Sequence, residues 1–183
     1  MTVASNPPET LVRPGLEELI ERLRQCTGRT SEPRVTAQAV ANVLTELHPA
    51  PELLTPAERE GSRGGYTRNT LHAEADFSIT ALVWRPGQRT EIHDHLVWCT
   101  FLVLQGTETE TIFDIDGDHL VRKSQRERLT GSVSGVAPPD DIHQVHNTTD
   151  TVAITLHVYG ADLSKGTSVR RVYQERATPK YME

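Results

Sequence analysis

Cysteine is scarce in this chain, and an excess of basic residues is missing. Only Cys26 and Cys99 occur among 183 residues, too few for the disulfide framework that stabilises small secreted domains. The 19 lysines and arginines are outnumbered by 25 aspartates and glutamates, which gives a formal charge of -6. Without a positive field to attract phosphates, nucleic acid is excluded as an expected partner. The cysteine count fits a reducing compartment, and we expect a cytoplasmic protein.

Long apolar runs are absent as well. No segment approaches the roughly 18 apolar residues of a membrane-spanning helix, and residues 1–9 lack the basic flank and apolar stretch of a signal peptide. The 12 glycines and 11 prolines are too few for a collagen-like or low-complexity chain. We therefore expect a globular protein that does not contact a membrane, and we predict a monomer.

The length and apolar content fit one domain. A chain of 183 residues that is 36% apolar can bury a core of its own. Residues 1–13 have few apolar residues and no periodicity, so a flexible tail is predicted there. We predict a single domain over 14–178, with a helical part over 14–60 and a β-barrel over 64–176.

Two helices are predicted in the N-terminal part. Apolar residues recur at steps of three and four from 15 to 26 and again from 35 to 47. Pro49 and Pro51 end the second pattern, because proline cannot continue a helix. A further helical turn is predicted over 57–60.

After residue 64 the helical period gives way to short β-branched runs separated by turn residues. Arg122 to Arg128 is interpreted as a solvated, mixed-charge loop. Many short strands at close spacing favour a sandwich or a small barrel whose mouth can hold a ligand. The predicted strands cover residues 65–70, 77–84, 91–94, 98–105, 108–115, 119–123, 132–137, 143–146, 152–159 and 168–174.

The segment Glu91-Ile92-His93-Asp94-His95 contains a possible metal-binding pair. In an extended strand, His93 and His95 project from the same face, so both could bind one ion. A third imidazole from another strand, for which His143 is the candidate, would leave coordination positions open for substrate and oxygen. A lone pair of this kind is about as often a pair of polar residues at the rim of a barrel, so the spacing alone leaves the metal site undecided.

Other residues lie at regular distances from this pair. Five residues separate Gly87 from His93-Asp94-His95, and three more separate His95 from Cys99. This spacing resembles the first motif of the cupin superfamily, in which the position of Cys99 is usually a glutamate ligand. The second motif is matched by Pro138, Asp140, His143 and Asn147, with Asp140 in place of the usual glycine. The resemblance implies a mainly β fold, a cupin (jelly-roll) β-barrel with an N-terminal α-helical segment and one metal ion inside the barrel.

Five segments narrow the resemblance to one family. They are Tyr66-Thr67-Arg68-Asn69, His93-Asp94-His95, Phe101 through Gln105-Gly106, Glu110-Thr111-Ile112-Phe113-Asp114 and Leu156-His157-Val158-Tyr159. By these segments the chain is identified, over residues 64–160, as a member of the cysteine dioxygenase family. This resemblance implies Fe(2+) as the cofactor, bound by His93, His95 and His143, and it implies L-cysteine and O2 as substrates with cysteine sulfinic acid as the product.

The resemblance also implies how the substrate is recognised. Arg68 would hold the substrate carboxylate through paired, charge-assisted hydrogen bonds, and Tyr66 would add a hydroxyl nearby. By composition alone, Arg68 would be a solvated arginine at a strand edge. Its place within Tyr-Thr-Arg-Asn favours the substrate-binding role.

In the family, a cysteine and a tyrosine can be joined in a thioether, and here these are Cys99 and Tyr159. The resemblance implies that Tyr159 donates a hydrogen bond to dioxygen or substrate, and that His157 holds the phenol. Thr155 stands where the family usually has serine, so it keeps the hydroxyl and adds a methyl group. Without the resemblance, Cys99 would be interpreted as a small buried apolar residue.

Two other functions stay open. The first is a dioxygenase of another small thiol, such as 3-mercaptopropionate, cysteamine or homocysteine. Arg68 favours cysteine, because relatives that prefer 3-mercaptopropionate usually have glutamine there. The second is a noncatalytic metal-binding cupin. Tyr159, His157 and Cys99 speak against it, because metal binding alone needs no phenol directed at oxygen.

Overall fold

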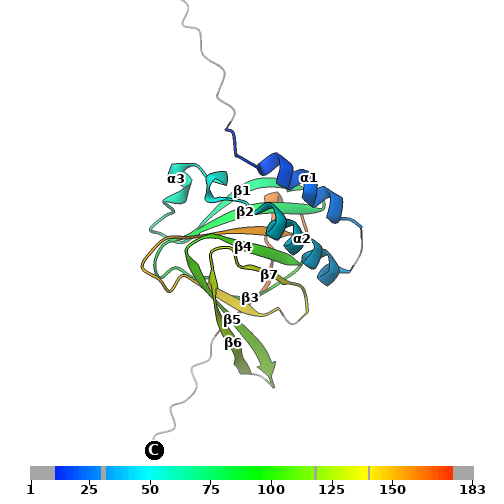
Figure 1. Ribbon diagram of the computed structural model, residues 1–183. Coiled ribbons are helices and arrows are strands. Elements are labelled where there is room, and N and C mark those ends of the chain that lie inside the picture. The colour runs from blue at the N-terminus through cyan, green and yellow to red at the C-terminus, as the bar shows by residue number, and fades with distance from the viewer. Residues whose placement is uncertain (1–10, 30–31, 118, 140, 175–183) are drawn as a thin grey trace, which may run out of the picture.

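The computed structural model describes residues 11–29, 32–117, 119–139 and 141–174 as a helical layer packed on two antiparallel sheets (Figure 1). The helical layer consists of α1 (Leu16–Cys26), α2 (Pro33–Leu47), a 3-10 turn η1 (Pro51–Leu53) and α3 (Pro56–Arg59). No helix within these ranges is long and apolar enough to cross a lipid bilayer.

The two predicted helices are confirmed as α1 and α2. Each buries the apolar stripe expected from its period, which includes Leu19 and Leu23 in α1 and Val40 and Leu44 in α2. Helix α2 begins two residues earlier than predicted, because Pro33 fits the first turn of a helix, where no backbone N–H is needed.

The end of the predicted tail is anchored. The structural description begins at residue 11, so most of the predicted tail 1–13 lies outside it. Arg13, however, forms two hydrogen bonds to Glu58, of 2.9 and 2.8 Å, and a third to the carbonyl of Leu53. Glu58 also completes a capping box with Thr55 at the start of α3. The assignment of residue 13 to a flexible tail was therefore wrong.

Within the described ranges, ten strands follow the helices. One sheet has the order β1-β2-β9-β4-β7 and the other the order β10-β3-β8-β5-β6. The strands are β1 (Thr67–Glu74), β2 (Phe77–Trp84), β3 (Ile92–His95), β4 (Cys99–Gln105), β5 (Thr107–Asp116), β6 (His119–Leu129), β7 (Val133–Val136), β8 (His143–His146), β9 (Ala153–Tyr159) and β10 (Val169–Tyr173), with a 3-10 turn η2 (Leu163–Lys165) before β10.

The central strands of the first sheet, β2, β9 and β4, are buried on both faces. Helices α1 and α2 cover the outer face of this sheet (Figure 1), where Ile79 and Val83 join the main hydrophobic core. The alternate residues Leu82 and Trp84 point inward and contact Val145 of the second sheet. The space between the two sheets is therefore lined by the inward residues of β2, β4 and β9, and it contains the candidate site.

One predicted loop proved to be a strand. Arg122 to Arg128 belongs to β6, which pairs with β5 along its whole length. Figure 1 shows the β5–β6 hairpin extending away from the helices and the other sheet. Because water reaches both faces of its outer part, polar side chains occupy both, and the alternation that would indicate a strand is missing.

Candidate active site

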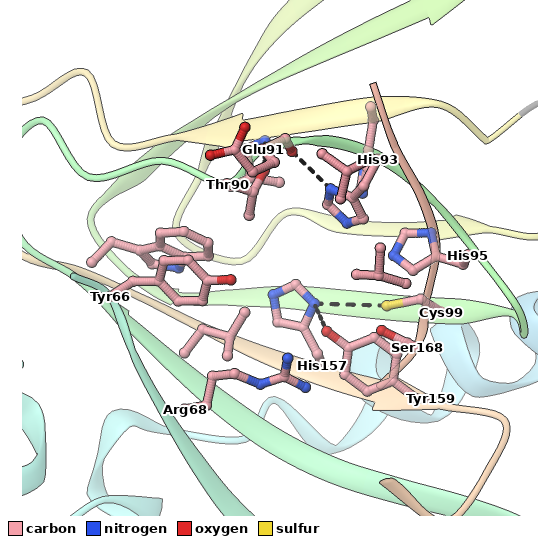
Figure 2. Close-up of a pocket in the computed structure, with 16 residues that line it drawn as sticks. Tyr66, Arg68, Thr90, Glu91, His93, His95, Cys99, His157, Tyr159 and Ser168 are labelled. Atoms are coloured by element: carbon pink, nitrogen blue, oxygen red, sulfur yellow. Dashed lines mark hydrogen bonds between the residues drawn. The ribbon is translucent and has the colours of Figure 1, made fainter. Parts of the chain in front are cut away.

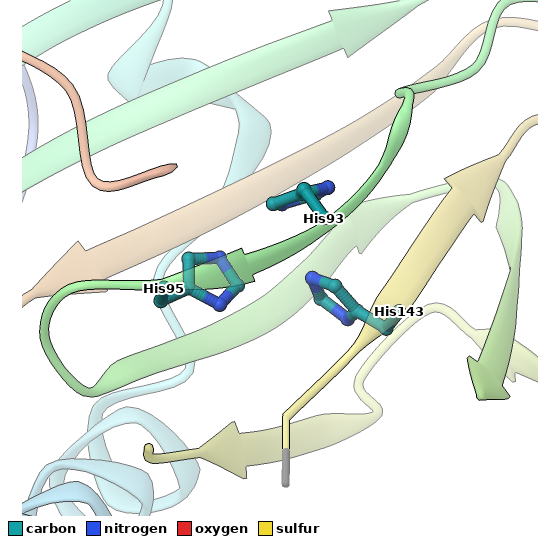
Figure 3. A group of neighbouring side chains, drawn as sticks. All are labelled: His93, His95 and His143. Atoms are coloured by element: carbon teal, nitrogen blue, oxygen red, sulfur yellow. The ribbon is translucent and has the colours of Figure 1, made fainter. Parts of the chain in front are cut away.

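Three buried histidines meet between the sheets. His93 and His95 lie on β3, and His143 on β8 is the pairing partner of His93. Their ligand atoms all lie within 4.8 Å of one another, and the ring centroids are 4.8 to 5.0 Å apart (Figure 3). Three imidazoles at this spacing could bind one divalent ion on one side and leave its other side open.

Each of these rings has a hydrogen-bond acceptor at Nδ1. The Nδ1 atom of His93 lies 2.9 Å from the carbonyl of Glu91, and that of His95 lies 2.9 Å from Oδ2 of Asp141. The Nδ1 atom of His143 lies 3.1 Å from Oε1 of Glu110. An acceptor at Nδ1 keeps the proton there and leaves the Nε2 lone pair free for a metal, so the donor set fits a metal ion.

The protonation of the cluster suits this role. Burial and the neighbouring imidazoles lower the pKa of His93 to about 3. Burial also lowers the pKa of His95, although Asp141 opposes the shift. Burial raises the pKa of Glu110, but His143 and Arg128 outweigh it, and the net pKa lies below its usual value. His93 and His95 are thus neutral ligands, and Glu110 is an ionised acceptor at neutral pH.

Glu110 and Asp141 are functional residues that the sequence analysis did not identify. Glu110 belongs to one of the segments that resemble the family but was assigned no role of its own, and Asp141 was not predicted. No local signal distinguishes either acid, because each takes its role from a histidine 33 or 46 positions away in the sequence. Asp140, the departure noted in the second motif, lies outside the described residues.

Removing the carboxylate charge beside His143 should weaken metal binding. We expect Glu110→Gln to reduce the affinity for iron(II) by about 10- to 100-fold, because the acceptor that orients the ring loses its charge. Competition with a chelating dye measures the affinity. Glu91→Gln is the control, because His93 contacts the backbone carbonyl of Glu91, which this substitution retains. Equal affinities of wild type and Glu110→Gln would contradict the prediction.

Glu108, two residues before Glu110, is the second buried acid of β5. Its side chain is fully buried, and neither carboxylate oxygen has a hydrogen-bond partner within the described part of the chain. Burial and the charge of Glu110 raise the pKa of Glu108 to about 8. Glu108 is therefore a neutral acid at pH 7.

Because this pKa is raised, we predict that the free energy of unfolding falls as the pH rises. The folded protein holds the Glu108 proton between about pH 4.5 and 8, whereas the unfolded chain releases it, so the free energy of unfolding should decrease by about 1.4 kcal/mol per pH unit in this window. Glu108→Gln removes this contribution. Urea unfolding of the metal-free protein at several pH values measures both curves. Parallel curves for wild type and Glu108→Gln would contradict the prediction.

A cavity of about 140 Å³ opens at the three histidines. Its polar lining includes Tyr66, Arg68, Cys99, His157 and Tyr159 (Figure 2). The structure thus brings the predicted site residues of five strands and of the segment before β1 to one small cavity. Thr155, which was also predicted, does not line the cavity and lies behind His157.

His157 stands at the centre of a chain of contacts. Its Nδ1 atom lies 3.4 Å from the Tyr159 hydroxyl and 3.7 Å from the Cys99 sulfur (Figure 2). On the other side of the ring, Nε2 lies 2.9 Å from the Thr155 hydroxyl. Burial raises the pKa of Cys99 and of Tyr159 and lowers that of His157. All three side chains are therefore uncharged.

Arg68 lies at the cavity and has no protein partner among the residues that the structure describes. It belongs to β1 and is exposed, and within the described ranges no side chain or carbonyl forms a hydrogen bond or ion pair with its guanidinium. Figure 2 shows the guanidinium on the same side of the cavity as Tyr159. An arginine in this position is free to bind an anionic group of a ligand.

The C-terminal strand forms another wall of the cavity, a role that the sequence analysis did not assign to particular residues. Val169 and Val172 of β10 line the cavity. The strand is held to β3 by Asp94, whose carboxylate accepts hydrogen bonds from Arg170, at 3.1 Å, and from Tyr173, at 2.8 Å. Asp94 stands between the two histidines of β3, so one short strand carries both two of the three clustered histidines and the attachment of the cavity wall.

Two five-stranded antiparallel sheets around a three-histidine cluster define a cupin, also called a double-stranded β-helix. A Klebsiella pneumoniae protein described as uncharacterized, with a double-stranded beta-helix domain, has a similar structure with a TM-score of 0.50 and 16% identity over 64% of this chain and 96% of its own. A Desulfitobacterium hafniense cupin superfamily protein gives a TM-score of 0.46 and 15% identity over 60% and 85%. A Salinispora arenicola cupin 2 conserved barrel protein gives 0.44 and 23% over 58% and 86%. The predicted fold class is confirmed.

A family model is more specific than these likenesses of fold. The model of the family described as cysteine dioxygenase type I matches residues 18–172. The chain therefore belongs to this family, as the sequence motifs predicted, and it is a dioxygenase-family cupin with a three-histidine site.

Proposed function

We propose that the protein is a mononuclear iron(II) thiol dioxygenase that converts L-cysteine and O2 to L-cysteine sulfinic acid. The observation that carries the proposal is the meeting of three imidazoles and the unpartnered Arg68 at one small cavity. His93, His95 and His143 would hold the iron. When bound, iron(II) supplies an uncompensated double positive charge, which favours a thiolate, and the redox chemistry that activates dioxygen.

The residues of the chain would bind and orient the substrate. Arg68 would hold the carboxylate of cysteine by two charge-assisted hydrogen bonds, which directs the thiol toward the histidines. The Tyr159 hydroxyl would donate a hydrogen bond to the reacting atoms. Val169 and Val172 would keep bulk water from the reacting sulfur. Both atoms of O2 end on sulfur, which is oxidised from thiol to sulfinic acid while O2 is reduced, so no further reductant is needed.

Oxygen uptake with product analysis tests this function. The iron-loaded protein should consume one O2 for each sulfinate formed, and L-cysteine should be used faster than 3-mercaptopropionate or cysteamine. Protein treated with a chelator is the control. Absence of oxygen uptake with all three thiols would overturn the proposed function, and preferential use of another thiol would change only the substrate.

We further propose that turnover joins Cys99 to the ring of Tyr159. The two residues are partners across β4 and β9, and both side chains contact Nδ1 of His157. Forming the carbon–sulfur bond breaks the S–H bond of Cys99 and one ring C–H bond of Tyr159, and the two protons and two electrons released reduce one O2 to hydrogen peroxide. Intact mass after turnover should fall by the mass of two hydrogens in wild type and stay constant in Cys99→Ser. An unchanged wild-type mass would leave Cys99 as a packing residue.

A further inference from the structure

Trp84, at the end of β2, contacts both the cavity wall and the residues behind His157. Its side chain is fully buried. Its ring stacks on Tyr66, with centroids 4.4 Å apart and an interplanar angle of 26°. Its indole nitrogen donates a hydrogen bond of 2.9 Å to the Thr155 hydroxyl. One buried indole thus adjoins both Tyr66 and the chain of contacts that ends at Tyr159.

The indole determines where the Thr155 proton points. An indole N–H can only donate, so the Thr155 oxygen is the acceptor in this bond. The Thr155 hydroxyl is fully buried, and its own proton also needs an acceptor. Within the described part of the chain, the only other partner of this hydroxyl is Nε2 of His157, at 2.9 Å. The arrangement that satisfies every group has Thr155 donating to Nε2.

The proton of His157 is then fixed as well. Burial keeps the pKa of His157 well below its usual value, so the ring is neutral and carries one proton. With Nε2 accepting from Thr155, that proton resides on Nδ1. The Nδ1–H group faces the Tyr159 hydroxyl at 3.4 Å and the Cys99 sulfur at 3.7 Å. Tyr159 can therefore accept a hydrogen bond from His157 and direct its own proton into the cavity that it lines.

We propose that Trp84 is a positioning residue that acts through Thr155 to keep the proton of His157 on Nδ1, so that the hydroxyl proton of Tyr159 points into the cavity. Loss of the indole N–H would free the Thr155 hydroxyl to accept a bond from Nε2–H. Nδ1 would then carry a lone pair, and Tyr159 could turn its proton toward His157 and away from the substrate. The consequence for turnover rests on the proposed function, whereas the proton position does not.

The position of the proton can be measured directly. Two-bond ¹H–¹⁵N correlation spectra of histidine-labelled, full-length protein, metal-free and zinc-loaded, distinguish a protonated from an unprotonated ring nitrogen. Wild type should show His157 protonated on Nδ1. Trp84→Phe keeps a ring to stack on Tyr66 but removes the N–H, and Thr155→Val removes the hydroxyl. Each variant should therefore shift the population of His157 toward the form protonated on Nε2. Thr155→Ser should behave as wild type.

Matched substitutions control for loss of packing. Trp98→Phe makes the same change at the other buried tryptophan. Thr100→Val removes a buried hydroxyl on the outer face of the same sheet, where it donates a hydrogen bond to the carbonyl of Ala37 in α2. Both should leave the His157 signal unchanged. Nε2–H in wild type, or an unchanged proton position in both Trp84→Phe and Thr155→Val, would overturn the proposal. If a variant fails to fold, the wild-type spectrum still tests the proposal, because it shows which ring nitrogen of His157 carries the proton.

Turnover gives an independent readout. Trp84→Phe should lower kcat for cysteine about ten-fold, as expected for one hydrogen bond, with little change in KM. Because Trp84 acts through Thr155, the double variant with Thr155→Val should be no slower than Thr155→Val alone. Additive losses would overturn the proposal. Absence of turnover in wild type would overturn the proposed function and leave the spectroscopic result standing.

Discussion

His143→Ala is expected to abolish stoichiometric binding of iron(II), and His146→Ala to leave it intact. Both histidines belong to β8, three residues apart, and therefore project from opposite faces of the strand. Only His143 joins the cluster whose ligand atoms lie within 4.8 Å. Losing one of three ligands should reduce the affinity for iron(II) by more than about 100-fold. This is a larger effect than losing a residue that only forms a hydrogen bond to a ligand.

Anaerobic titration followed by metal analysis of the desalted protein measures this effect. Wild type and His146→Ala should retain about one iron per chain, and His143→Ala should retain almost none. Circular dichroism tests whether His143→Ala is folded. We expect it to fold, because the substitution retains the hydrophobic cluster of Ile92, Phe113 and Ile142 beside this site. Retention of one iron by folded His143→Ala would show that the three histidines are not the binding site.

The prediction of the fold succeeded where strands are bounded by turn residues and bury apolar side chains. Strands β2 and β4 lie within one residue of their predicted limits, and the Gln105-Gly106 turn leads directly into β5. Gly106 has φ of +77°, and a Cβ there would lie 2.9 Å from the carbonyl of Val152. Only glycine fits this turn without strain, so the residue itself indicates the turn.

That His93 and His95 share one face was predictable from local spacing, but the approach of His143 was not. Residues two apart on a strand share a face whatever the rest of the fold does. The position of His143 depends on the register between β3 and β8, which no local pattern encodes. His143 was therefore only a candidate third imidazole from the residues alone, and the family resemblance supported the choice.

The residues that orient the ligands depend still more on long-range packing. Asp141 meets His95 across 46 positions of sequence, and Glu110 meets His143 across 33. Nothing in the segments around either acid distinguishes it from a solvated surface residue, since its role follows from burial beside a histidine. The same holds for Trp84, which a sequence shows only as an apolar residue in a buried strand.

Arg68→Ala is expected to reduce kcat/KM for L-cysteine by about 100-fold, because two hydrogen bonds to a charged carboxylate are lost. Cysteamine lacks the carboxylate, so its use should change by no more than about two-fold. Arg68→Lys should give an intermediate value, since an ammonium keeps the charge but cannot form the paired hydrogen bonds of a guanidinium. Initial rates of oxygen uptake with each thiol provide these ratios.

The comparison between the two thiols separates substrate recognition from damage to the site. A distorted cavity would slow both thiols alike, whereas a lost carboxylate contact slows only cysteine. Arg63→Ala, an exposed arginine outside the cavity lining, controls for the change in net charge and should leave both rates unaltered. Equal losses for cysteine and cysteamine in Arg68→Ala would contradict carboxylate binding by Arg68. Arg68 would then have neither a substrate carboxylate nor, within the described ranges, a protein group to pair with its guanidinium.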